Sequence, residues 1–131
     1  MIGLDTNVLV RYLTQDDPAQ AALATRVMEK DLSAARPGFI STVVLVETAW
    51  VLERLYKATR EEILEILSGF LGSPLIYIEN RAAIVRALAT ARQHETGFAD
   101  AVIAASSLTA GCDAVLTFDR GAVDAGMTLL E

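Results

Sequence analysis

Residues 1–9, MIGLDTNVL, place an aspartate directly after a short apolar run. Ile2–Asp5 predicts a buried strand, and apolar residues at helical spacing predict a helix over Thr6–Gln15. Asp5 therefore comes at the carboxyl end of a strand, where its side chain is also suited to cap the helix that follows. A strand that passes straight into a helix is the first step of an α/β fold.

The rest of the chain continues this alternation of strands and helices. Asp17-Pro18 is a helix start, and Thr59 with Glu62 forms a capping box that opens another helix. Alternation of this kind predicts a mostly parallel sheet, and the absence of a linker or repeat predicts one domain over residues 1–131. Further strands are expected at Phe39–Ser41, Leu75–Glu79, Ala114–Phe118 and Met127–Leu130, and further helices at 17–32, 43–56, 59 to 69 or 72, 82–95 and 98–109.

The charge balance limits the kinds of partner. Seventeen acidic residues against 11 Lys and Arg give a net charge of −6, which argues against tight non-specific binding of nucleic acid. It argues less against a metal nuclease, because the bound ion reverses the local field of its carboxylates. We expect no membrane span and no signal peptide. Cys112 is the only cysteine, so no internal disulfide can form, and we expect a cytoplasmic protein.

Four acidic residues occupy positions that need an explanation. Asp5 and Asp119 come at the carboxyl ends of two predicted strands, and Glu47 and Asp100 interrupt apolar helical segments. In a parallel sheet the carboxyl ends of the strands form the edge where ligands bind. Crowded carboxylates need a cation, and Mg²⁺ or Mn²⁺ prefers hard oxygen ligands. The pattern predicts a divalent metal site that can activate water and stabilise charge on a phosphate.

Each acid also has a local explanation. Asp5 suits a helix N-cap, Asp119 a turn residue, and Asp100 the positive end of a helix. Glu47 suits an ion pair with a basic side chain. Each explanation is reasonable by itself, but all four would have to hold at once, so we favour a shared metal site.

Four segments together resemble the PIN-domain family. They appear in matching order over essentially the whole chain. The small size and residues 51–62 resemble the VapC-type toxins of bacterial toxin–antitoxin pairs. The four segments are Leu4–Leu9 (LDTNVL), Glu47 on its apolar helix, Asp100–Ala105 (DAVIAA) and Thr117–Asp119 (TFD).

The resemblance implies a three-layer α/β/α fold with a central, mostly parallel sheet of four to five strands. It implies an endoribonuclease that hydrolyses RNA phosphodiester bonds with Mg²⁺ or Mn²⁺ held by Asp5, Glu47, Asp100 and Asp119. No His or Lys stands at the matched positions to act as a general base, so the metal should generate the nucleophile. The family also implies a homodimer and a cognate antitoxin that inhibits the site.

Further residues receive supporting roles from the resemblance. Thr6, Asn7 and Thr117 would hold the carboxylates by hydrogen bonds, although helix capping also suits Thr6 and Asn7. Arg11 and Arg120 follow two of the acids and would contact RNA phosphate, although an ordinary surface arginine is at least as good an interpretation.

Two alternatives remain open. The first is a non-catalytic interaction module with a PIN-like fold. The second is a haloacid-dehalogenase-like phosphatase with Asp5 as nucleophile, which has less support because the chain has Asn7 where such enzymes carry a second Asp, and no lysine after Lys57. We expect Trp50 and Tyr56 to pack in the core rather than stack on bases, although an exposed part of their helix would suit an antitoxin helix.

Overall fold

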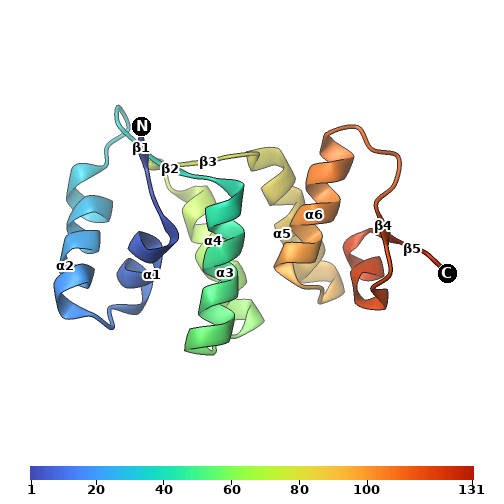
Figure 1. Ribbon diagram of the computed structural model, residues 1–131. Coiled ribbons are helices and arrows are strands. Elements are labelled where there is room, and N and C mark those ends of the chain that lie inside the picture. Colours follow the sequence, from blue (N-terminus) through green and yellow to red (C-terminus); the bar gives the residue numbers. More distant parts are fainter. The chain divides into compact units, whose positions relative to one another are not determined.

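The computed structural model describes residues 1–131, which form two compact units. Unit 1 comprises Met1–Glu79 and unit 2 comprises Asn80–Glu131. Both units combine helices with parallel strands (Figure 1). The two acids Asp5 and Glu47 belong to unit 1, whereas Asp100 and Asp119 belong to unit 2.

Unit 1 is built on a three-stranded parallel sheet in the order β1-β2-β3. Ile2 of β1 pairs with Gly38 of β2, which in turn pairs with Ile76 of β3. The elements are β1 Ile2–Gly3, α1 Thr6–Thr14, α2 Pro18–Arg26, a π-helical turn Val27–Asp31, β2 Gly38–Ile40, α3 Thr42–Tyr56, α4 Arg60–Gly72 and β3 Ile76–Ile78.

The core of unit 1 lies where its helices pack on one another and on the sheet. Helix α1 contacts both α2 and α3, and α4 contacts β3. The side chains of Leu9, Ile40, Leu45 and Leu67 are completely buried. Gly38 permits this packing, because a Cβ at that position would stand only 2.8 Å from Cδ1 of Leu4.

Unit 2 consists of two long helices and a short strand pair. Six small alanines of these helices are buried, which lets α5 and α6 pack closely side by side (Figure 1): Ala83, Ala87, Ala91, Ala101, Ala104 and Ala105. A hydrophobic cluster in unit 2 consists of Ala104, Ala122 and Met127, with Val115 packed against it. The elements are α5 Arg81–His94, α6 Phe98–Thr109, β4 Leu116–Thr117, a 3-10 helix η2 Arg120–Ala125 and β5 Thr128–Leu129, with β4 parallel to β5.

The α/β class and the parallel pairing of strands are confirmed. The helix over Phe98–Thr109 has the predicted bounds, and Asp17 and Thr59 cap their helices as expected. One difference is that the strands form a three-stranded sheet in unit 1 and a two-stranded sheet in unit 2, where one sheet of four to five strands was expected. The three layers and the single domain stay predictions.

Two further features differ from the sequence prediction. The helix predicted to reach residue 32 ends at Arg26 and passes into the π-helical turn, and η2 lies in a stretch where no helix was expected. Both are short segments whose hydrogen bonding departs from the α-helical pattern, which side-chain periodicity does not reveal. None of the helices combines the length and the apolar character needed to cross a membrane.

Candidate active site

Asp5 stands where β1 passes into α1. Its backbone is extended, and its Oδ1 accepts a hydrogen bond from the backbone N–H of Thr6 at 2.7 Å. The predicted capping role of Asp5 is therefore confirmed. The side chain is exposed, and its second oxygen receives no hydrogen bond within unit 1. The helix N-terminus stabilises the negative charge of this carboxylate while one oxygen stays available to a ligand.

Thr6 connects Asp5 to Glu47. The side chain of Thr6 is buried, and its hydroxyl donates a short hydrogen bond to Oε1 of Glu47, 41 positions further along the chain. The contact forms because α1 packs against α3. Glu47 makes no ion pair, so the predicted alternative of a basic partner is not what the structure shows. Unit 1 thus places two of the four acids on either side of one threonine.

Two polar groups fix the start of α3, the helix that carries Glu47. The Ser41 hydroxyl oxygen accepts the backbone N–H of Val44 at 3.2 Å, and the carboxylate of Glu79 accepts that of Thr42 at 2.8 Å. The backbone N–H of Glu79 also donates to the carbonyl of Ile40. Glu79 is a supporting residue that was not predicted from the sequence, although its place at the end of a predicted strand was a signal.

Asp119 has a local role in unit 2. It follows β4, and its Oδ1 accepts the backbone N–H of Gly121 at 2.8 Å, which caps η2. The hydroxyl oxygen of Thr117 accepts the backbone N–H of Asp119 at 3.0 Å. Thr117 therefore supports the main chain at Asp119, whereas the resemblance implied support of the carboxylate itself. The Asp119 side chain is exposed.

Asp100 lies in the first turn of α6 and is half-buried. Its position suits the positive end of the helix, which has Gly97 at its N-cap and no capping side chain. Neither unit by itself gathers three His, Cys, Asp or Glu side chains that could hold a metal ion. The convergence of all four acids on one ion stays a prediction.

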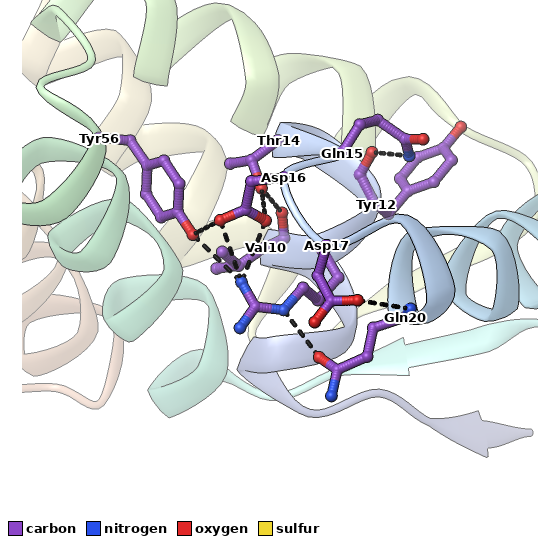
Figure 2. A network of polar contacts seen from close by, with 9 residues as sticks. Val10, Tyr12, Thr14, Gln15, Asp16, Asp17, Gln20 and Tyr56 are labelled. Atoms are coloured by element: carbon purple, nitrogen blue, oxygen red, sulfur yellow. Dashed lines mark hydrogen bonds and ion pairs between the residues drawn. The ribbon is translucent and has the colours of Figure 1, made fainter.

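A polar network that includes Asp16, Gln20 and Tyr56 joins α1, α2 and α3 (Figure 2), and Arg11 of α1 belongs to it. Its Nη1 lies 3.1 Å from Oδ1 of Asp16, and its Nε donates to Gln20 at 2.7 Å. The hydroxyl of Tyr56 donates to Asp16 at 2.6 Å. These contacts give Arg11 a structural role, and its contact with RNA stays a prediction. The same holds for Arg120, which is exposed at the start of η2.

The network shifts the titration of its two charged members. Hydrogen bonds from the hydroxyls of Tyr56 and Thr14 lower the pKa of Asp16 below its ordinary value. The negative charge of Asp16 raises the pKa of Arg11 in turn. Beside the network, a pocket of about 250 Å³ lies between α1 and α2. It is lined by Asn7, Val8, Arg11, Gln20, Leu23, Ala24 and Val27.

Trp50 corrects an expectation of the sequence analysis. The prediction that it packs in the core is wrong, because the side chain is 54% exposed. The core-facing residues of α3 are Leu45, Thr48, Ala49 and Leu52, which follow helical spacing and leave Trp50 outside the apolar stripe. Tyr56 is half-buried and takes part in the polar network.

Comparisons with known proteins agree with the resemblance. The sequence model of the PIN domain matches residues 2–126 and so spans both units. A protein of Aquifex aeolicus (strain VF5) named VapC ribonuclease is 25% identical over 117 residues, which cover 89% of this chain and 86% of that protein. The predicted likeness to PIN domains and to the VapC type is confirmed. The chain belongs to the PIN-domain family.

Proposed function

We propose that the protein is a metal-dependent endoribonuclease that hydrolyses phosphodiester bonds in RNA. One structural observation carries the proposal most. The backbone N–H of Thr6 is bound by Asp5 while its hydroxyl is bound to Glu47, so one residue fixes two exposed carboxylates. Membership of the PIN family and the name of the relative from Aquifex aeolicus support the same activity.

The chemistry of the donors fits a divalent cation. Asp5 and Glu47 each use one carboxylate oxygen in a hydrogen bond to Thr6, which leaves the other oxygen as a hard ligand of the kind that Mg²⁺ and Mn²⁺ prefer. We assign Asp5, Glu47, Asp100 and Asp119 as the residues that hold the ion, directly or through water. When bound, such an ion would lower the pKa of a water molecule and would stabilise the negative charge that develops on the phosphate.

The chain's own residues hold these carboxylates in place. Asp5 is fixed at the N-terminus of the nine-residue helix α1. The buried Thr6 limits the freedom of the exposed Glu47. Glu79 and Ser41 hold the first turn of α3, and so the segment from which Glu47 projects. Such outer contacts keep ligand oxygens oriented before an ion arrives.

The biological role follows from the VapC-type likeness. We propose that the protein acts in the cytoplasm as the toxin of a toxin–antitoxin pair, that it forms a homodimer, and that a cognate antitoxin inhibits it. These proposals rest on the family and on the name of the relative. A search for a small neighbouring gene that encodes a DNA-binding protein tests the pairing.

The Asp5→Asn, Asp100→Asn double variant tests the activity. The wild-type protein should cleave RNA with Mg²⁺ or Mn²⁺ and stop with EDTA, and the double variant should not cleave. Asp124→Asn is a matched control, because Asp124 is exposed in η2 and outside the assigned set. Undiminished cleavage by the double variant would contradict the assignment.

Metal binding separates the proposal from its alternatives. Calorimetry should show Mn²⁺ binding to the wild-type protein and weaker binding to the double variant. No binding at millimolar Mn²⁺ would instead support a non-catalytic interaction module. A trapped phosphoryl group on Asp5 would support the phosphatase alternative.

A further inference from the structure

The outer face of α3 carries a row of exposed residues that includes Glu47. Val43, Glu47, Trp50 and Arg54 follow one another at intervals of three or four residues, and all four are exposed. At 3.6 residues per turn, Trp50 and Arg54 lie within about 60° of Glu47 around the helix axis. They follow Glu47 at roughly 4.5 Å and 10.5 Å along that axis. The row therefore includes an assigned metal ligand, and Trp50 and Arg54 continue it toward the C-terminal end of α3.

Trp50 and Arg54 form a pair on this row. The guanidinium carbon of Arg54 lies 5.7 Å from the centre of the Trp50 ring, a distance at which a cation is attracted to an aromatic face. Arg54 is exposed and makes no ion pair with a carboxylate. In a chain with a net charge of −6, this leaves an uncompensated positive charge beside a large exposed ring.

Single-stranded RNA offers the two groups that such a pair binds. An unpaired base stacks on an aromatic ring or on a guanidinium plane, and the phosphate accepts hydrogen bonds from arginine. We propose that Trp50 and Arg54 bind the unpaired RNA next to the phosphate that is cleaved, with a base on Trp50 and a phosphate on Arg54. This inference rests on the proposed ribonuclease function, and it assigns both as positioning residues for the substrate.

The position of the pair favours RNA over other occupants. The row is continuous with Glu47, so a strand held at the carboxylates reaches Trp50 within one helical turn. Arg54 is complementary in charge to a phosphate. A second copy of the chain or an antitoxin helix would cover the same face, and binding of either one there in place of RNA would contradict the inference.

Fluorescence provides a direct test, because Trp50 is the only tryptophan of the chain. The Asp5→Asn variant is titrated with a single-stranded RNA oligonucleotide whose binding is followed independently by the anisotropy of a dye on the RNA. We expect quenching of Trp50 that saturates together with the anisotropy. An oligomer with the same phosphates but without bases should quench less. Unchanged Trp50 fluorescence at saturating RNA would overturn the inference.

Cleavage kinetics provide the second test. Trp50→Ala should raise KM for single-stranded RNA by roughly tenfold, as expected for the loss of one stacked base, with kcat little changed. Trp50→Phe should restore most of the loss, and Arg54→Gln should raise KM and weaken its dependence on salt. Leu55→Ala is the control, because Leu55 is 69% exposed on the same helix but points about 140° away from Trp50.

The outcomes separate this inference from the proposed function. If the wild-type protein cleaves RNA and Trp50→Ala leaves KM unchanged, the inference fails and the ribonuclease stands. If the wild-type protein does not cleave RNA at all, the proposed function fails. Light scattering that shows a dimer for the wild type and a monomer for Trp50→Ala would identify the face as a contact between copies. Loss of antitoxin binding with unchanged RNA affinity would also overturn the inference.

Discussion

Asp5 in unit 1 and Asp119 in unit 2 share one local design but differ in what surrounds them. Each follows a short parallel strand and accepts a backbone N–H at the start of a helix. Asp5 opens a nine-residue α-helix packed against two others, whereas Asp119 opens a six-residue 3-10 helix. Thr6, next to Asp5, reaches a second acid. Thr117, two residues before Asp119, accepts only a main-chain hydrogen bond.

Both aspartates cap a helix that packs against a helix with a further acid, α3 for α1 and α6 for η2. The difference is that only unit 1 has a buried threonine that hydrogen-bonds to this further acid. In unit 1, α1 and α3 meet and the buried Thr6 joins their carboxylates. In unit 2, the hydrogen bonds of Asp119 reach no further than three residues along the chain. Both aspartates are therefore placed by local chain geometry, and tertiary packing adds Glu47 to Asp5 through Thr6.

Neutralising each aspartate gives the largest expected effect. Asp5→Asn and Asp119→Asn keep a good N-cap residue but remove the charge. We expect each to lower kcat/KM for RNA cleavage by more than the roughly 100-fold that loss of an outer contact of a metal ligand costs. Thermal unfolding, the control, should change little. If Asp119→Asn kept full activity while Asp5→Asn lost it, Asp119 would have only a capping role, in contrast to Asp5.

Removing the two threonine hydroxyls gives the next largest effect. Thr6→Ala should lower Mn²⁺ affinity and cleavage by about 10- to 100-fold, because Glu47 loses the hydrogen bond that orients it. Thr6→Ser keeps the hydroxyl and should restore most of the activity. Thr117→Ala should have a smaller effect, since Thr117 touches only the main chain of Asp119. Equal losses for the two alanine variants would break the comparison.

Deleting the caps should affect stability less. Asp5→Ala should lower the free energy of unfolding by about 1 kcal/mol, within the range of roughly 0.5–2 kcal/mol known for N-caps. Asp119→Ala should cost less, because η2 is shorter than α1. Urea unfolding measures both, with the two Asp→Asn variants as controls. A larger loss for Asp119→Ala would show that η2 matters more to the fold than its length suggests.

Acid titration of the network in unit 1 should give the smallest effect. The pKa of Asp16 lies below its ordinary value of 3.8, with the Tyr56 hydrogen bond as the largest cause. A lowered folded pKa contributes stability that is present above the ordinary value and is lost as the pH falls through the folded pKa. The Tyr56→Phe variant should therefore be less stable than the wild type at neutral pH. Its free energy of unfolding should also fall by less between about pH 4 and pH 2. The free energy of unfolding is measured against pH for the wild type and for Tyr56→Phe, and parallel curves would contradict this account.

The sequence by itself determined the local features of the protein. Caps at Asp5, Asp17 and Thr59, and apolar periodicity in the helices, depend on residues within about one turn of one another. The order of strands and helices follows from these signals, as does the placing of Asp5 and Asp119 directly after strands. They were predicted correctly because the physical interactions behind them are short in sequence.

Only the tertiary structure decided which distant residues meet. The Thr6–Glu47 contact, the binding of Asp16 by Arg11 and Tyr56, and the outward position of Trp50 all depend on how α1, α2 and α3 pack. Side-chain spacing defines the apolar face of each helix but not the rotation or crossing angle at which two faces meet. The strand order β1-β2-β3 within unit 1 has the same origin, since hydrogen bonds between strands depend on which segments are brought side by side.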